Sequence, residues 1–138
     1  MNTPVTKGKD IQRAWHHVDV QGKILGRVAV EIAGKLLGKT KPYFVRNLEC
    51  GDYVVVTHAK SVVVTGNKEK EKKYSRYSGY PGGLRVETVE EVRKRKPEEL
   101  IRHAVFGMLP KNKLRDSMIK RLYSYADNIH PYKEKLTT

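Results

Sequence analysis

The sequence has little cysteine and no long hydrophobic run, and both deficits exclude whole classes of protein. Its 138 residues contain a single cysteine, Cys50, which rules out an internal disulfide and fits a reducing compartment. No apolar stretch approaches the ~20 residues of a membrane-spanning helix, and residues 1–10 lack the apolar core of a signal peptide. We therefore expect a cytoplasmic protein with no membrane partner, in a chain whose length is typical of one domain.

Acidic residues are also scarce relative to basic ones. The 15 Asp and Glu stand against 28 Lys and Arg, which gives a formal net charge of +13. Such an excess repels itself unless a polyanion neutralises it, and the common polyanions are nucleic acid and anionic membranes. Binding to a membrane surface would need a basic amphipathic helix or a lipid anchor, and the sequence shows neither. Nucleic acid is thus the expected partner. Residues 1–13 are predicted to be a basic tail, or plain terminal disorder.

The hydrophobic pattern of the first half predicts an α/β fold. Residues 15–20 and 53–57 are expected to form strands, and a second valine-rich run, residues 61–66, another. Continuous valine rather than alternation indicates strands buried on both faces, as in a sheet covered by helices. Between the first two strands lies a helix that should end at Gly38, before Pro42. Its apolar stripe consists of Leu25, Ala29, Ile32, Ala33, Leu36 and Leu37.

The second half is predicted to be mainly helical. The sequence Thr88–Glu91 is a capping box that starts one short helix, and Pro97 starts another. A basic break at residues 107–112 precedes a further helical stripe, and residues 121–125 fit a last strand. Neither a repeat nor a linker divides the chain, so we predict one domain, 1–138, with an extended C-terminal segment, 126–138.

The most unusual stretch lies in a predicted loop, residues 67–86. From Lys72 to Arg85 it holds three tyrosines, four basic residues and three glycines without a carboxylate. Tyrosine rings can stack on unpaired bases, Lys and Arg can meet phosphates, and glycine lets the backbone approach closely. Tyr80-Pro81-Gly82 fits a type II turn. These features favour an RNA-binding loop, and the alternative is a solvated hairpin whose tyrosines fold back on the core.

Signals for an enzyme are weak. The segment Gly34–Thr40 resembles a phosphate-binding P-loop, but it has three residues rather than four between its glycines, and it ends a helix instead of preceding one. The five histidines show no metal-ligand spacing, and nothing flanking Cys50 supports a nucleophile. A nucleotide-dependent enzyme using Gly34–Thr40 therefore remains only as an alternative. We expect no catalytic or metal site and no cofactor.

Basic residues outside the loop extend the predicted binding surface. They gather around Arg93–Lys96 and again from Lys111 to Arg115. Irregular RNA is favoured over duplex DNA, because proteins read RNA mainly at loops and unstacked bases, and neither a zinc finger nor a basic zipper is visible. On charge and composition, the candidate RNA contacts are Lys35, Lys39, Lys41, Lys72, Arg76, Arg85, Lys94, Arg95 and Arg115.

Five motifs together resemble those of the ribosomal protein L13 family, most closely its bacterial form. They are Val18–Ala29, Gly51–Val56, Val64–Lys68, Tyr77–Gly83 and Gly107–Asn112, in the family's order over about residues 15 to 131. The chain departs from the family pattern at Thr57-His58-Ala59, where an Asn-Ala pair is common, and after His130-Pro131.

The resemblance implies a three-layer α/β/α fold around a four-stranded, largely parallel sheet, and no enzymatic activity. It also implies binding to large-subunit rRNA early in assembly, beside neighbouring large-subunit ribosomal proteins, without a small-molecule substrate or a homo-oligomer. A non-ribosomal RNA-binding regulator is the remaining alternative. The family's RNA-facing positions carry over to Arg27, Lys68, Lys73, Tyr74, Tyr77, Tyr80, Gly82, Gly83, Lys111, Asn112 and Lys113.

Overall fold

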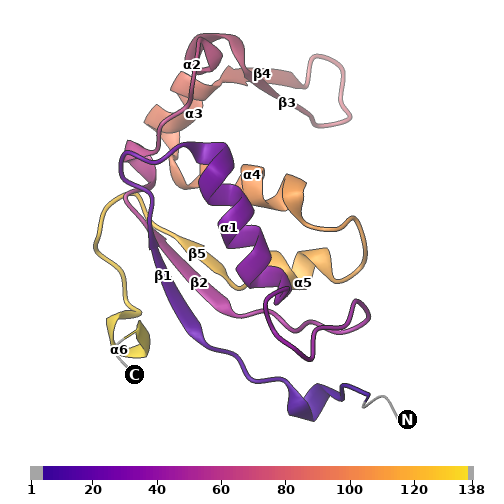
Figure 1. Cartoon of the computed structure of the whole chain (residues 1–138). Coiled ribbons are helices and arrows are strands. Elements are labelled where there is room, and N and C mark those ends of the chain that lie inside the picture. The colour runs from indigo at the N-terminus through magenta and orange to yellow at the C-terminus, as the bar shows by residue number, and fades with distance from the viewer. Residues whose placement is uncertain (1–4, 137–138) are drawn as a thin grey trace.

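A small parallel sheet lies at the centre of the computed structural model, which describes residues 5–136 (Figure 1). Its strands are β1 (Trp15–Asp19), β2 (Tyr53–Thr57) and β5 (Leu122–Ser124), in the order β1-β2-β5. Val18 lies opposite Val56, and Val54 opposite Leu122, so these four side chains point to the same face and join the hydrophobic core. The predicted first, second and last strands are therefore confirmed.

Helices cover that face of the sheet. The helix α1 (Leu25–Leu37) packs against α4 (Glu98–Met108), and α5 (Arg115–Ile119) lies beside both (Figure 1). The predicted stripe of α1 is confirmed, with Leu37 half-buried at its end and Val28 as an additional buried member. Gly38 caps α1 with a φ of 80°, and a Cβ there would collide with the carbonyl of Cys50, so only glycine fits.

The second valine run does not form a strand. His58 adopts a left-handed conformation with a φ of 60° and turns the chain into a short 3-10 helix, η2 (Ala59–Ser61). Val63 instead forms an isolated parallel bridge with Ile24, just before α1. Its amide donates to the Lys23 carbonyl (2.8 Å), and its carbonyl accepts from the Leu25 amide (2.9 Å). The α/β class is confirmed, but within residues 5–136 the parallel sheet has three strands rather than four.

A two-stranded hairpin projects from one end of this core (Figure 1). It follows α2 (Lys68–Glu71) and consists of β3 (Lys73–Tyr77) and β4 (Leu84–Thr88), which pair antiparallel. The predicted turn is confirmed: Gly82 has a φ of 72°, and the Gly83 amide donates to the Tyr80 carbonyl (2.9 Å). Thr88 caps α3 (Val89–Arg95) by accepting from the Glu91 amide, as predicted.

The face of the sheet opposite the helices is covered by aromatic rings. Trp15 stacks on Tyr53 with ring centroids 4.4 Å apart and on Tyr132 at 5.1 Å. Tyr132 belongs to the segment 126–136, which the sequence predicts to be extended and which contains the short helix α6 (Lys133–Leu136). Within residues 5–136 this face is therefore covered mainly by aromatic rings rather than by a sheet-spanning helix, and the predicted three-layer arrangement is not confirmed.

The described part of the N-terminal segment lies along the loop that leads from α1 to β2. It contains the 3-10 helix η1 (Gly8–Asp10). The Thr6 hydroxyl donates to the Tyr43 carbonyl (2.7 Å), and the Arg13 guanidinium donates to the Glu49 carbonyl (2.9 Å). Residues 1–4 of the predicted tail lie outside the described residues. Within the described part of the chain, no helix is long and apolar enough to span a bilayer.

Candidate nucleic-acid interface

The hairpin separates its three tyrosines into two environments. Tyr77 and Tyr80 are 66% and 75% exposed near its tip, whereas Tyr74 is half-buried and packs its ring against that of His103 at 4.7 Å. Tyr74 thus folds back on the core, as the hairpin alternative expects, whereas the outer two tyrosines face solvent. Lys73, Ser75 and Tyr77 share one face of β3, while Tyr74 and Arg76 share the other.

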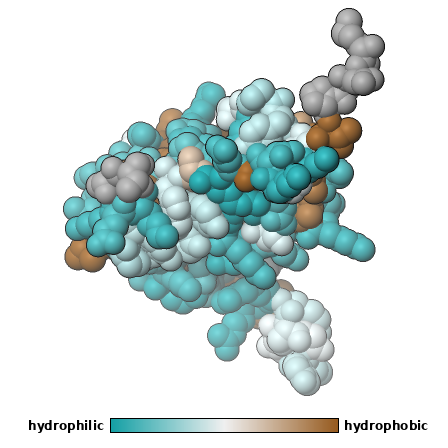
Figure 2. Space-filling view, turned by 90° about the horizontal axis from the view of Figure 1, so that it is seen from below, coloured by the Kyte–Doolittle hydropathy of each residue, from teal (hydrophilic) through white to brown (hydrophobic). Residues whose placement is uncertain are grey.

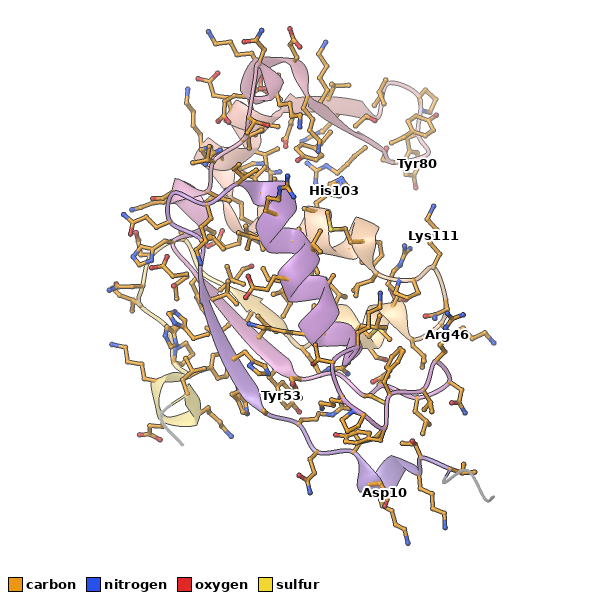
Figure 3. The ribbon with its side chains drawn as sticks, viewed as in Figure 1. Asp10, Arg46, Tyr53, Tyr80, His103 and Lys111 are labelled. Carbon is orange, nitrogen blue, oxygen red and sulfur yellow. The ribbon has the colours of Figure 1, made fainter. Side chains whose placement is uncertain are left out.

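Several predicted contacts lie along one side of the molecule. Figure 3 places Tyr80 at the hairpin tip, Lys111 below it and Arg46 further along the same side. Lys111, Asn112 and Lys113 are exposed in the loop after α4, and the amide of Leu114 donates to the Asn112 side chain (3.0 Å). Arg115 instead lays its guanidinium over the Phe106 ring, 3.8 Å from the ring centroid. That stacking holds the cation at the end of the loop.

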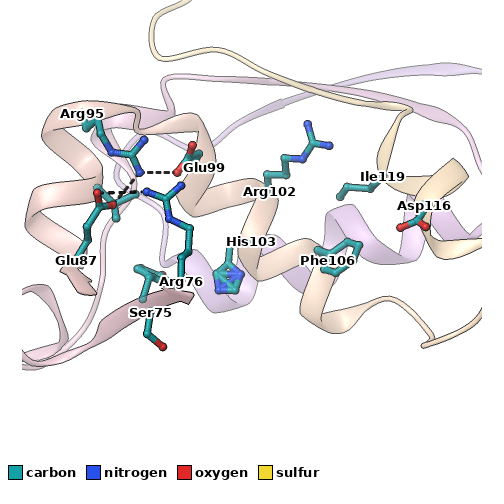
Figure 4. Close-up of a pocket in the computed structure, with 12 residues that line it drawn as sticks. Ser75, Arg76, Glu87, Arg95, Glu99, Arg102, His103, Phe106, Asp116 and Ile119 are labelled. Atoms are coloured by element: carbon teal, nitrogen blue, oxygen red, sulfur yellow. Dashed lines mark hydrogen bonds and ion pairs between the residues drawn. The ribbon is translucent and has the colours of Figure 1, made fainter. Parts of the chain in front are cut away.

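A first groove lies between the hairpin and α4, and we call it the mixed-charge groove. It measures about 500 Å³, and Figure 4 shows the side chains that line it. Arg76, Arg95 and Arg102 contribute three cations, and Glu87, Glu99 and Asp116 contribute three carboxylates. Arg95 donates to both Glu87 (2.8 Å) and Glu99 (2.9 Å), so its charge is already neutralised. These ion pairs raise the pKa of Arg95 further.

A second groove lies on the other side of the Tyr74–His103 ring pair, between the start of α1 and the end of α4, and we call it the lysine groove. It measures about 420 Å³, and Lys68, Lys72 and Lys73 line it together with Tyr74 and His103. Partial burial and the nearby Lys72 lower the pKa of His103, so its ring is neutral at pH 7. Burial and the nearby Glu69 raise the pKa of Tyr74, whose hydroxyl stays protonated.

Other predicted contacts lie apart or have partners within the protein. Lys35 follows Arg27 by eight residues along α1, a rise of about 12 Å, so Lys35 and Lys39 are not brought to the hairpin. Lys35 pairs with Glu31 (3.1 Å), and Lys94 pairs with Glu90 (3.4 Å).

Arg85 is exposed on β4, where it faces Arg76 across the hairpin. Two predicted hairpin glycines have structural reasons to be glycine. A Cβ on Gly83 would collide with the Ser78 hydroxyl, and Gly82 has a positive φ, which glycine adopts readily.

Lys41 has a structural position. Its ammonium lies 2.6 Å from the carboxylate of Asp52, and both side chains are largely buried. Although burial alone would raise it, the pKa of Asp52 is lowered by hydrogen bonds from Lys41, from the Ala14 amide and from His16. The sequence shows Lys41 only as another basic residue at the end of a helix, and its carboxylate partner comes eleven residues later in the chain.

We expect Lys41→Gln to destabilise the fold by about 3 kcal/mol, because removing one partner of a buried ion pair leaves the other charge uncompensated. Urea unfolding measures this loss.

The effect of Lys41→Gln should also depend on pH. In the wild type the Lys41–Asp52 pair stabilises the fold fully above the ordinary carboxyl pKa of about 4, and its contribution disappears as the pH falls through the lower folded-state pKa of Asp52. The variant should therefore lose less stability than the wild type on acidification. Lys39→Gln, a change at an exposed neighbour, is the control, and equal effects of the two would contradict the assignment.

Sequence reasoning overlooked two arginines. Arg46 and Arg102 are exposed, and Arg102 lines the mixed-charge groove from α4. Its place off the apolar stripe of α4 was a usable signal. Arg93, which begins the predicted basic cluster Arg93–Lys96, has partners within the protein: it binds Glu69 through two hydrogen bonds (2.8 and 3.0 Å) and also donates to the carbonyls of Lys60 and Val62. No local pattern connects residues this far apart.

The glycines of Gly34–Thr40 do not form a phosphate cradle. They lie at the C-terminal end of α1, where the amides of Gly38 and Lys39 both donate to the Gly34 carbonyl (3.0 and 3.2 Å). Their hydrogen bonds are therefore used within the helix cap. Nor do three or more His, Cys, Asp and Glu side chains gather in a metal-binding arrangement anywhere in residues 5–136.

The remaining surface is largely polar. The face shown in Figure 2 is mostly hydrophilic, with hydrophobic residues in small separate patches. Together with the charge of +13 and the projecting hairpin, this places the chain among small basic α/β proteins that present cations and aromatic rings from one side.

Comparison with known proteins identifies the family. The ribosomal protein L13 family profile matches residues 13–131. Among curated relatives, large ribosomal subunit protein uL13 of Dehalococcoides mccartyi (strain BAV1) is 49% identical over 96% of this chain and 92% of its own length. The uL13 proteins of Chlorobium luteolum and Bordetella petrii are 45% and 48% identical over 96% of this chain, and 89% and 93% of theirs. The chain therefore belongs to the ribosomal protein L13 family and is of the bacterial type.

Proposed function

We propose that this protein is a structural component of the large ribosomal subunit that binds and stabilises large-subunit rRNA, acting early in assembly and in the cytoplasm. The observation that carries the proposal is the projecting hairpin, which exposes Tyr77 and Tyr80 and holds Tyr80 on the same side of the molecule as Lys111 and Arg46. Membership of the L13 family supports the assignment to the large subunit. The protein supplies fixed charge and ring faces rather than a reaction.

Basic and aromatic side chains of this surface would interact with different parts of the RNA. Exposed lysines and arginines lower the repulsion between phosphates that a compact RNA fold brings together, and each phosphate contact releases counterions. Aromatic rings add stacking energy at bases that are already unpaired. A rigid α/β core holds both sets in fixed relative positions, so one local RNA conformation is favoured over others. Neighbouring ribosomal proteins would contact the remaining surface.

Crosslinking in living cells tests the proposal directly. A tagged copy of the chain is crosslinked with ultraviolet light, purified under denaturing conditions, and the attached RNA is sequenced. We expect dominant sites in large-subunit rRNA, carried by peptides from residues 68–113. Crosslinks scattered over messenger RNAs would favour an RNA-binding regulator, and the absence of RNA crosslinks above background would overturn the proposal. Thermal protection by ATP, lost in Lys39→Ala, would instead support a nucleotide-dependent enzyme.

A further inference from the structure

The lysine groove differs in charge from its neighbour. Both grooves are lined by Tyr74 and His103, but three carboxylates offset the arginines of the mixed-charge groove. The lysine groove is lined by Lys68, Lys72 and Lys73, and no carboxylate is among its lining residues. The two grooves share a ring pair but differ in charge: the charges of the mixed-charge groove balance, whereas the lysine groove is positive. An anionic occupant belongs in the lysine groove.

The lining of the lysine groove includes large apolar side chains that are incompletely covered. Ile24, Val63 and Met108 line it and remain 42%, 41% and 45% exposed, although each is a large hydrophobic side chain. Beside them, the neutral His103 ring and the Tyr74 ring meet at an angle of 55°. Figure 3 places His103 between the hairpin and the start of α1. Flat apolar surface bordered by ring faces suits a planar ligand such as a nucleobase.

Backbone donors at the edge of the groove complement the lysines. Gly26, in the first turn of α1, lines the groove, and an added Cβ there would meet nothing within 4 Å. The Leu25 amide is used by the Val63 carbonyl, and the next amide, that of Gly26, lies in the first turn of α1, where backbone amides have no partner within the helix. The Gly26 amide and three lysines among the lining residues offer donors for a phosphate, while the apolar side chains of the lining suit a ring.

We propose that the lysine groove holds a single unstacked rRNA nucleotide, with its phosphate at the Lys68–Lys72–Lys73 rim and its base on the Tyr74–His103 rings and Met108. The inference rests on the proposed function and specifies one site within it. The volume of about 420 Å³ is within the range of roughly 300–1,000 Å³ found for small-ligand pockets. A flipped-out nucleotide is the one RNA element that combines an anion with a detached flat base.

A pair of glycines in helices permits a sharp test. Gly107 lines the groove near the end of α4, and Gly34 lies in α1 away from both grooves; a Cβ on either one would meet nothing within 4 Å. Gly107→Leu therefore fills the groove, and Gly34→Leu makes the same change elsewhere. Leucine favours helix more than glycine does, so both variants should fold, which circular dichroism and thermal melting verify.

The experiment assembles each variant of the full chain into large subunits, crosslinks them with ultraviolet light and identifies nucleotide–peptide adducts by mass spectrometry. We expect wild-type adducts on the peptides that carry Tyr74, His103 or Met108. Gly107→Leu should reduce them about tenfold and weaken binding to purified large-subunit rRNA by a similar factor, which is within the range for losing one stacked base. Gly34→Leu should change neither.

Each other outcome is informative. Adducts on the hairpin tip without any in the groove, or groove adducts that persist in Gly107→Leu, would overturn the nucleotide site and leave the proposed function intact. Equal losses in both glycine variants would show that the effect does not come from the groove, and they would also overturn the site. The absence of adducts with large-subunit rRNA from every peptide would overturn the proposed function itself.

Discussion

Replacing Arg121 with alanine should cost about 3–5 kcal/mol of folding stability, because the change removes one partner of a buried ion pair. Arg121 is only 7% exposed. One terminal nitrogen lies 2.9 Å from the Glu49 carboxylate, and the other donates to the Leu36 carbonyl at the end of α1 (3.1 Å). The side chain thus joins α1, the loop before β2 and the start of β5. A loss of this size is a large fraction of the ~5–15 kcal/mol stability of a typical domain.

The electrostatics of Arg121 explain why the effect should be large. Burial, and then the nearby Arg13, lower the pKa of this guanidinium, and the Glu49 carboxylate is its ion-pair partner. Chemical denaturation of Arg121→Ala measures the loss. The matched control is Lys120→Ala, at the adjacent exposed position, which should stay within about 0.5 kcal/mol of the wild type. A loss below about 1 kcal/mol in Arg121→Ala would show that the three segments hold together without it.

The double variant Tyr77→Ala/Tyr80→Ala should bind large-subunit rRNA at least about 30-fold more weakly, since each lost base–ring stack is worth ~1–3 kcal/mol. Its melting temperature should be unchanged, because both rings are exposed and absent from the core. A filter-binding titration at physiological salt measures the affinity, and melting curves measure the stability.

The control for the hairpin keeps the rings and removes only the hydroxyls. Tyr77→Phe/Tyr80→Phe should bind nearly as the wild type does if stacking is the main interaction. Strong loss in the phenylalanine variant would indicate that hydroxyl hydrogen bonds carry the affinity. Unchanged binding in the alanine variant would exclude the hairpin tip from the interface and leave the lysines as the main contacts.

Local patterns in the sequence predicted the elements that local forces decide. The apolar stripe of α1, its stop at Gly38, the turn at Tyr80–Gly82 and the cap at Thr88 all depend on residues within a few positions of one another, and all are confirmed. The last strand was also found, because its flanking signals are local. The family motifs are confirmed by comparison with known proteins.

Long-range pairing decided what the sequence could not show. The valine run 61–66 has strand propensity, but the left-handed His58 and the bonds from Arg93 to the carbonyls of Lys60 and Val62 hold the segment in another conformation. Likewise, Lys41 and Arg95 read as free cations in the sequence, whereas folding brings each against carboxylates. Positive charge in a sequence gives the sign of the partner, and only the fold shows which charges remain available to it.

The order of strands in the sheet also determines when the fold can be completed during synthesis. The β1 strand can pair with β2 once residue 57 has emerged, but the other edge of β2 waits for β5 at residues 122–124. At the ~5–20 residues per second of translation, that interval lasts several seconds. The Trp15 ring likewise lacks its stacking partners Tyr123 and Tyr132 until the C-terminal residues are made. The interval before the sheet closes, rather than the finished fold, is when this chain is most exposed to aggregation.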